Sequence, residues 1–242
     1  MQACYHEGQS HSGRPVTRPE RMTRTPEPEL MTDREQAAAY AAADLSEVNE
    51  PIAGWFQTRF SPLAPGARLL DIGCGTADIT IRLVGAYPGI TALGIDGSAA
   101  MLSFGQDLVD KAGLTSRVAL EQRYFPDAAL KSAGFDAVTA TNLLHHISDP
   151  ISFWRAASRC AKPGAPILVA DLRRPPDADF AARLTEQYAW RAMPPLRRDL
   201  LNSLHAAYTA EEVRQQLREA GLPGLAVEEA GPLHLVVWGH GA

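Results

Sequence analysis

The stretch Ala67-Arg68-Leu69-Leu70-Asp71-Ile72-Gly73-Cys74-Gly75-Thr76-Ala77-Asp78 decides the fold of this 242-residue chain. A short apolar run up to Ile72 leads into two glycines that stand two residues apart, and an apolar helical pattern follows. This order of strand, glycine turn and helix opens a nucleotide-binding βαβ unit. Because Gly73 and Gly75 lack a Cβ atom, the backbone of the turn can approach a ligand closely and adopt positive φ angles.

Acidic residues distinguish this turn from the usual dinucleotide-binding turn. The sixth position of the glycine motif is Asp78, where Gly or Ala would pack beside a pyrophosphate, and Asp71 closes the strand. Two carboxylates would repel a pyrophosphate but suit a ligand that carries a cationic or amine group. A second apolar run begins about 20 residues after the turn and ends in Asp96, which can accept both hydroxyls of a ribose.

With these features the chain resembles the class I S-adenosylmethionine (SAM)-dependent methyltransferases. Residues 69–78 are similar to the first motif of that family, 94–102 to the second, and 135–146 to the fourth strand and its exit. Residues 161–164, Ala-Lys-Pro-Gly, are similar to the segment that precedes the fifth strand in the family. The resemblance runs from about Ala37 to the C-terminus, and it implies an enzyme that transfers the methyl group of SAM.

The composition of the chain bounds its class. Hydrophobic residues make up 45% and charged residues 21%, which is ordinary for a globular domain. The net charge of -5 argues against non-specific nucleic-acid binding. The dispersed Cys4, Cys74 and Cys160 predict neither a disulfide framework nor a metal site. Because no apolar run is as long as a membrane span and the N-terminus has no signal core, we expect a cytoplasmic protein without nucleic-acid or membrane partners.

The chain is predicted to form one domain, 34–242, preceded by an arm. Residues 1–33 are polar, contain four prolines and show no periodicity, which predicts a disordered arm. Its basic stretch, 14–24, is interpreted as a solvated tail, with a partner contact as the alternative. Residues 33–60 favour a pair of helices, with Thr32 or Asp33 as the first cap and Pro51 at the start of the second helix.

The rest of the domain alternates between strands and helices. Strands are predicted near 67–72, 91–95, 117–121, 135–141 and 165–171, and helices near 77–86, 98–112, 127–132 and 150–161. The segment 172–205 is too long for a plain connection, so we expect a helical lid. Thr209 and Glu212 predict a capping box for a last helix, which two antiparallel strands near 225–229 and 233–238 follow.

These elements predict an α/β fold of the Rossmann-like type. It has a seven-stranded, mostly parallel sheet with helices on both faces, an N-terminal helical cap and a helical lid after strand five. As in the family, one strand of the sheet is expected to be reversed.

The cofactor is expected at the carboxyl ends of the strands. The resemblance implies that Gly73 and Gly75 approach the methionine part of SAM and that Asp96 accepts the ribose hydroxyls. It also implies that residues 98–101 border the ribose and adenine and that carbonyls near 141–142 hold the ammonium group. The predicted cofactor residues are Asp71, Gly73, Cys74, Gly75, Asp78, Asp96, Gly97, Ser98, Met101, Tyr124, Phe125, Thr141, Asn142 and Leu143.

Two of these positions carry open interpretations. The family often has an acidic residue after the third strand that accepts the adenine amino group, but this chain has Arg123-Tyr124-Phe125 there. Tyr124 or Phe125 can stack on the adenine instead. Asp78 is interpreted either as a water-mediated cofactor contact or as a cap of the helix that follows.

Acceptor binding and catalysis are assigned to the same cleft. The candidates for the acceptor site are Tyr40, Asn49, Arg173 and Arg174. One of the two arginines can clamp a carboxylate or phosphate of the acceptor. His145 and His146 stand where a general base can act, and one of them is expected to face the cleft; the alternative is that both are structural. Lid residues that can add to the pocket are Tyr188, Trp190, Arg191, Arg197, Arg198, Asn202 and His205, whereas His234 is interpreted as an edge residue.

The sequence thus predicts a SAM-dependent methyltransferase that acts on a small organic molecule and binds no metal. Two alternatives are a SAM-binding enzyme that catalyses a cyclisation, elimination or pericyclic reaction, and a non-catalytic SAM-binding partner protein. The motif of exocyclic-amine methyltransferases is absent, because Thr141-Asn142-Leu143-Leu144 occupies its place. The cysteines are too few and too dispersed along the chain for arsenite chemistry of the usual three-thiol type. The acceptor atom and the oligomeric state have no signal in the sequence.

Overall fold

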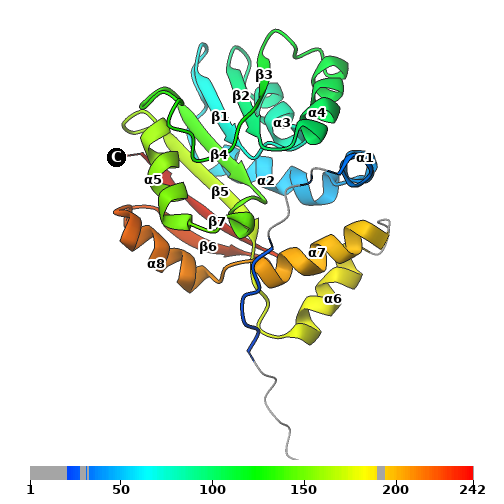
Figure 1. Ribbon diagram of the computed structural model, residues 1–242. Coiled ribbons are helices and arrows are strands. Elements are labelled where there is room, and N and C mark those ends of the chain that lie inside the picture. Colours follow the sequence, from blue (N-terminus) through cyan, green and yellow to red (C-terminus); the bar gives the residue numbers. More distant parts are fainter. Residues whose placement is uncertain (1–20, 28–30, 32, 190–193, 242) are drawn as a thin grey trace, which may run out of the picture.

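A seven-stranded sheet forms the centre of the molecule (Figure 1). The computed structural model of the chain describes residues 21–27, 31, 33–189 and 194–241. The strands are β1 (Arg68–Ile72), β2 (Thr91–Asp96), β3 (Val118–Gln122), β4 (Ala137–Thr141), β5 (Pro166–Leu172), β6 (Ala226–Ala230) and β7 (His234–His240). Their order is β3-β2-β1-β4-β5-β7-β6, and β7 runs antiparallel to both of its neighbours while β1 to β5 pair in parallel. The predicted sheet with one reversed strand is therefore confirmed.

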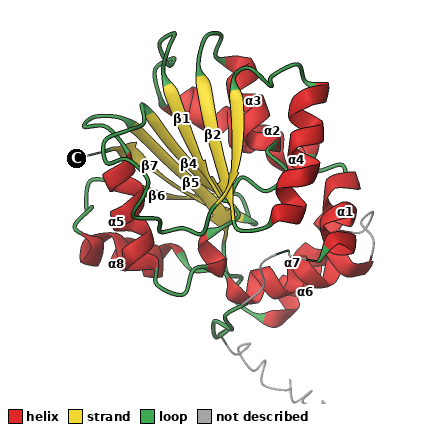
Figure 2. Cartoon of the chain, turned by 45° about the horizontal axis from the view of Figure 1, so that its top comes forward, coloured by secondary structure: helices red, strands yellow, loops and turns green. Residues whose placement is uncertain are grey.

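Helices cover both faces of this sheet, as Figure 2 shows. The helices beside the sheet are α2 (Ser46–Arg59), α3 (Asp78–Ala86), α4 (Ala99–Lys111), α5 (Pro150–Cys160) and α8 (Ala210–Ala220). Alternate residues of a strand point to opposite faces, so Leu70 and Ile72 of β1 join the core under α5 and α8, whereas Leu69 joins the core under α2, α3 and α4. The three-layer arrangement leaves the carboxyl ends of the strands at one edge, where the predicted site lies.

The predicted lid after β5 consists of two helices. They are α6 (Ala178–Ala189) and α7 (Pro194–Ala206), which pack against each other and against Leu172 and Leu233 at the sheet edge. Helix α1 (Arg34–Ala42) contacts α7 and α4, so the N-terminal cap and the lid meet. Asp33 caps α1 by accepting the Glu35 and Gln36 N–H groups, as predicted.

Two local predictions are wrong. Residues 127–132 form turns instead of a helix, because the Asp127 carboxylate accepts the Ala129 N–H and the Arg159 side chain donates to the Asp127 carbonyl. Pro51 does not begin a helix but lies inside α2. The helix starts earlier because the Asp44 carboxylate accepts the N–H of Ser46 at 3.1 Å and so fixes the first turn.

The expectation of a disordered arm needs correction for residues 21–27, which we call the N-terminal segment. This segment lies against the lid, where the Met22 N–H donates to the Pro176 carbonyl at 3.0 Å and the Thr25 N–H donates to the His205 carbonyl at 2.9 Å (Figure 1, dark blue). These backbone hydrogen bonds hold a stretch whose sequence has no periodicity of its own. Residues 1–20, 28–30 and 32 of the predicted arm lie outside the described residues.

In the part of the chain that the structure describes, no helix combines the length and the apolar character that crossing a bilayer requires.

Candidate functional site

A cavity of about 350 Å³ opens at the carboxyl ends of β1, β2, β4 and β5. Its walls come from α1 and α2, the glycine turn after β1, the ends of β2 and β4, and the lid helices. This volume lies within the range of small-molecule pockets. The predicted site residues that line the cavity are Tyr40, Asn49, Gly73, Cys74, Gly75, Asp78, Asp96, Gly97, Met101, Tyr124, Phe125, Thr141, Asn142, Leu143, His145 and His146.

The glycine turn has the conformation that its sequence predicts. Gly73 and Gly75 have φ angles of 69° and 54°. A Cβ atom on Gly73 would lie 2.8 Å from Leu143, which follows β4. The turn therefore needs glycine both for its backbone angles and for its closeness to the far wall of the cavity.

Asp96 joins the glycine turn to the start of α4. Its two carboxylate oxygens accept the Gly75 N–H at 2.9 Å and the Ser98 N–H at 2.8 Å. Burial raises the pKa of this carboxyl. Each oxygen keeps a further lone pair toward the cavity, so the carboxylate can still accept a ligand hydroxyl. The contacts of Asp96 with these two backbone N–H groups are therefore compatible with the predicted ligand role.

Two predicted cofactor residues lie outside the cavity wall. Asp71 is fully buried beneath the turn, where its carboxylate accepts the hydroxyls of Thr80 and Thr139. Burial raises its pKa to about 6. Ser98 caps α4 by accepting the Met101 N–H at 3.2 Å. These two residues support the site from behind and do not face a ligand, because their side chains are occupied by neighbouring backbone and hydroxyl groups.

Asp78 forms a polar cluster with Asn49 of α2 and Arg82 of α3. Its carboxylate accepts Nδ2 of Asn49 at 3.0 Å and Nε of Arg82 at 2.7 Å. The cap of α3 is Ala77, which makes no side-chain hydrogen bond, so the capping interpretation of Asp78 is wrong. Burial, followed by the charges of Asp78 and Asp96, raises the pKa of Tyr40 to about 12. The Tyr40 phenol therefore stays neutral beside these two carboxylates.

Asn142, which directly follows β4, lines the cavity with a backbone in the left-handed region. Asn142 has a φ of 49°, and its buried Oδ1 has no hydrogen-bond partner among the described residues. This side chain offers a free acceptor atom to a ligand. Across the cavity lie Arg123, Tyr124 and Phe125, of which Tyr124 is 63% exposed. No acidic residue stands at these three positions, as the sequence indicates.

His145 forms a buried pair with Asp171 at the end of β5. The imidazole Nδ1 lies 2.6 Å from Oδ1 of Asp171, and Oδ2 accepts the Leu144 N–H at 2.5 Å. Burial would raise the pKa of Asp171, but the adjacent imidazole and the Leu144 N–H outweigh it, so this pKa lies below its usual value. Because an ionised carboxylate only accepts, Nδ1 carries the proton and Nε2 is left as the basic nitrogen.

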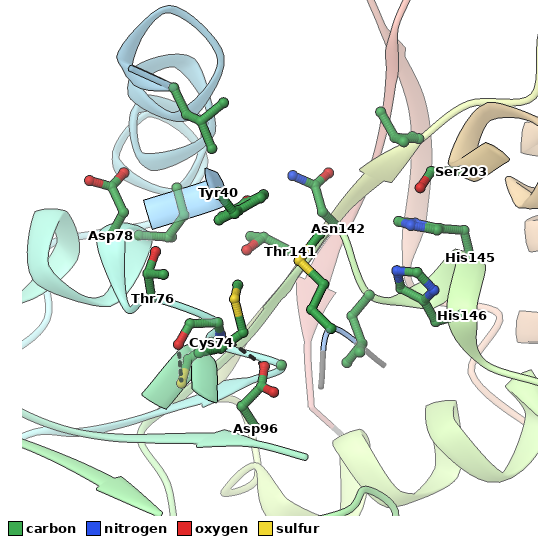
Figure 3. A pocket seen from close by; sticks show the side chains of 18 of the residues that line it. Tyr40, Cys74, Thr76, Asp78, Asp96, Thr141, Asn142, His145, His146 and Ser203 are labelled. Atoms are coloured by element: carbon green, nitrogen blue, oxygen red, sulfur yellow. Dashed lines mark hydrogen bonds between the residues drawn. The ribbon is translucent and has the colours of Figure 1, made fainter. Parts of the chain in front are cut away.

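His146 lies beside His145 on the short 3-10 helix η1 (Leu144–His146), and both side chains line the cavity (Figure 3). The prediction that only one of them faces the cleft is wrong, because the tight 3-10 turn keeps the two rings together, with centroids 4.0 Å apart. Nδ1 of His146 is buried without a partner among the described residues. Burial, and then the charge of His145, lowers the pKa of His146 to about 3.

The two arginines predicted to clamp the acceptor do not line the cavity. Arg173 pairs with Glu229 of β6, and Nη2 of Arg174 donates to Glu212 of α8 at 2.5 Å. Leu172 is the last residue of β5 that lines the cavity. The guanidinium groups of the two arginines after it form ion pairs with these carboxylates outside the cavity. The sequence could not show this, because Glu212 and Glu229 are far along the chain.

Several lining residues were missed. The lid adds Leu196, Asp199, Leu200 and Ser203 to the predicted Tyr188, and β7 adds His234. His234 was interpreted as an edge residue, but β7 lies between β5 and β6, so its side chain is buried and faces the cavity. Burial lowers its pKa to about 4. Arg197, Arg198, Asn202 and His205 are not among the lining residues, and Trp190 and Arg191 lie outside the described part of the chain.

One group of described residues has the composition of a metal site. Donor atoms of Glu27, His145 and His146 lie within 4.8 Å of one another. Two of the three already hold other partners, because His145 Nδ1 bonds to Asp171 and the Glu27 carboxylate accepts the Ser203 hydroxyl at 2.9 Å. The expectation of a metal-free site stays a prediction.

Comparison with known proteins identifies relatives of the chain. A family model described as a methyltransferase domain matches residues 70–167. A ubiquinone biosynthesis O-methyltransferase of Methylococcus capsulatus is 32% identical over 69% of this chain and 67% of its own length. A ubiquinone/menaquinone biosynthesis C-methyltransferase of Vibrio cholerae is 29% identical over 69% of this chain and 64% of its own. The crystal structure of a SAM-dependent methyltransferase from Aquifex aeolicus superimposes with a TM-score of 0.61 at 20% identity, over 87% of this chain and 99% of that one.

Proposed function

The chain belongs to the class I SAM-dependent methyltransferases, and on that premise we propose that it methylates a hydroxyl oxygen of a small, uncharged organic acceptor. The observation that carries this proposal is the buried pair of His145 and Asp171, whose imidazole lines the same cavity as the glycine turn. A hydroxyl is a poor nucleophile until it loses its proton, and a histidine held by a carboxylate is suited to take it.

The residues of the cavity fit SAM. Gly73 and Gly75 line the cavity without a Cβ atom, so a ligand can approach the backbone of the turn closely, and the partnerless Oδ1 of Asn142 can accept from an ammonium group. Asp78 and Asp96 supply negative charge for a cationic ligand. Asp96 would accept the ribose hydroxyls, with Gly97 and Met101 beside the nucleoside. When bound, SAM supplies a methyl group on a sulfonium that needs no further activation.

The chain's own residues would supply positioning and proton transfer. The Asp171 carboxylate holds the proton on Nδ1 of His145, so Nε2 can accept the proton of the acceptor hydroxyl. With SAM bound, the acceptor oxygen would form its bond to the methyl carbon while the carbon–sulfur bond of the sulfonium breaks, so that S-adenosylhomocysteine would leave and the acceptor proton would remain on Nε2. In-line alignment in the cavity would provide much of the remaining rate.

The charges around the cavity support an uncharged acceptor. Its acidic lining residues are Asp78, Asp96 and Asp199, whereas the guanidinium of Arg123 is held by Glu121 and Asp127. His146 and His234 are neutral at physiological pH because burial lowers the pKa of each, to about 3 and about 4. The lid side adds the apolar side chains of Leu172, Leu196, Leu200 and Leu233 beside Asp199 and Ser203. An anionic acceptor would find no free cation among these described lining residues.

Two alternatives have no specific observation in their favour. A purely non-catalytic role leaves the pair of His145 and Asp171 without a catalytic function, and a non-methylating reaction could use the same base but has no other contact in its support. A cytoplasmic location is likewise our proposal, supported by the unpaired, buried Cys74 and Cys160.

A matched pair of phenols tests the proposal. We expect the enzyme, given SAM with a deuterated methyl group, to methylate a hydroxyl of 3,4-dihydroxybenzaldehyde faster than one of 3,4-dihydroxybenzoate, which differs by one carboxylate. Mass spectrometry and NMR locate the label. Equal or faster methylation of the benzoate would contradict the charge argument, and consumption of acceptor without S-adenosylhomocysteine would point to the non-methylating alternative.

A further inference from the structure

The N-terminal segment contacts η1, the turn that carries His145, through the side chain of Arg24. Its backbone is tied to the lid through Met22 and Thr25, and its Glu27 accepts the Ser203 hydroxyl of α7. Glu27 is buried even though it precedes the first helix of the domain. The segment is therefore part of the wall around the site.

Arg24 makes the most specific contacts of this segment. Its Nε donates to the Ala206 carbonyl at 2.7 Å, and its Nη2 donates to the carbonyl of His145 at 3.0 Å. The guanidinium plane lies over the ring of Tyr208, with 4.0 Å between Cζ and the ring centroid. A planar fork that stacks on an aromatic ring and donates in two directions uses features that lysine lacks.

Further contacts hold η1 and the residue after it, and they come from β5 and from the segment that follows α7. Asp171 of β5 accepts the Leu144 N–H, and the Tyr208 hydroxyl donates to the Ile147 carbonyl at 3.0 Å. Arg24 covers the ring of that same Tyr208. The backbone around His145 is thus held before, at and after the residue by three side chains.

The turn needs such outside support. A 3-10 helix of three residues has poorer internal hydrogen-bond geometry than an α-helix, so contacts from outside the turn add to what fixes its orientation. Without Arg24, the partly buried carbonyl of His145 would lose its donor and the turn could rotate. A rotation would move the imidazole away from Asp171, because the two groups meet at a single 2.6 Å contact.

We infer that Arg24 is a positioning residue, which fixes the η1 turn so that His145 keeps its contact with Asp171 and its place in the cavity. This inference rests on the proposed role of His145 as the base. It assigns a task to a residue that lies before the domain predicted from sequence.

The first test observes His145 directly and needs no acceptor. In the full-length protein labelled with 15N-histidine, the Nδ1 proton shared with Asp171 should give a low-field resonance that is absent from His145→Gln. We expect this resonance to be lost or broadened in Arg24→Ala, weakened in Arg24→Lys, and unchanged in Arg21→Ala, which alters an exposed arginine of the same segment. An unaltered resonance in folded Arg24→Ala would overturn the inference; should that variant not fold, Arg24→Lys decides in the same way.

The second test uses turnover with 3,4-dihydroxybenzaldehyde. Arg24→Ala should lower kcat by about 10- to 100-fold, because a small displacement of a catalytic group has effects of that size, and should leave the dissociation constant of SAM unchanged. In the His145→Gln background the same substitution should cause no further loss. If Arg24→Ala lowered kcat by the same factor in the His145→Gln enzyme as in the wild-type enzyme, Arg24 would act only on the fold. Unchanged turnover in His145→Gln alone would instead refute the proposed base and leave the resonance test standing.

Discussion

Asp71 and Asp96 lie at the same edge of the sheet but have different roles, because their surroundings differ. Asp71 lies one residue before the end of β1 and Asp96 ends β2, and the sequence predicts a cofactor role for both. Asp71 is sealed beneath the glycine turn by Thr80 and Thr139, whereas Asp96 reaches the cavity. Their positions could be predicted from the strand pattern, but the depth of each side chain depends on hydroxyls that come from other elements.

Substitution of Asp96 should weaken SAM binding. Asp96→Ala removes an ionised acceptor, for which we expect a loss of roughly 2–3 kcal/mol, or about a 30- to 150-fold rise in the dissociation constant. The melting temperature should also fall, because the Gly75 and Ser98 N–H groups lose their acceptor. Calorimetry with S-adenosylhomocysteine measures the affinity. The control is Asp107→Ala, at an exposed position of α4, the helix that follows Asp96. Unchanged affinity in folded Asp96→Ala would refute the ribose assignment.

Asp71 should make stability depend on pH in mildly acidic solution. Its pKa rises from 3.8 in the unfolded chain to about 6 in the fold, so the folded state binds more protons between these values. The wild-type protein therefore loses stability relative to Asp71→Asn as the pH rises through this window, by up to about 3 kcal/mol. Urea unfolding of both proteins on either side of the window measures the difference. A difference that stays constant with pH would show that Asp71 does not titrate in the fold.

At the scale of single elements, the sequence predicts best where the pattern is local. Each of the seven strands lies within a few residues of its predicted place, because apolar runs between turns are a local signal. The predicted helix at 127–132 fails because the Asp127 side chain closes a turn there. Pro51 predicts a helix start, but α2 already begins at Ser46, whose N–H donates to the Asp44 carboxylate. Side-chain hydrogen bonds of this kind outweigh propensity over one turn.

The capping box of α8 is an element whose contribution can be measured. The Thr209 hydroxyl accepts the Glu212 N–H at 3.2 Å, and the Glu212 carboxylate accepts the Thr209 N–H at 2.8 Å. Thr209→Ala should lower the free energy of unfolding by about 1 kcal/mol, whereas Thr209→Ser keeps the hydroxyl and should lower it less. Urea unfolding compares the two variants. Equal losses would show that the hydroxyl is not what stabilises the start of α8.

At the scale of the whole molecule, the site depends on contacts between distant segments. The bond from Arg24 to His145 spans 121 residues, and the bond from Arg24 to Ala206 spans 182. A single sequence carries no signal for such pairs, which is why the N-terminal segment was predicted as a disordered arm and His234 as an edge residue. The glycine turn, Asp96 and the two histidines could be predicted because each lies at the end of a recognisable strand.

The central claim is that this methyltransferase activates an acceptor hydroxyl through His145. The most direct measurement compares wild-type and His145→Gln enzymes at saturating SAM with 3,4-dihydroxybenzaldehyde, following the formation of S-adenosylhomocysteine and of the labelled methyl ether. We predict that His145→Gln lowers kcat by about 10²- to 10⁴-fold, the range for loss of a general base, while its affinity for SAM stays the same. Equal turnover by the two enzymes, or a label found on carbon, would contradict the account.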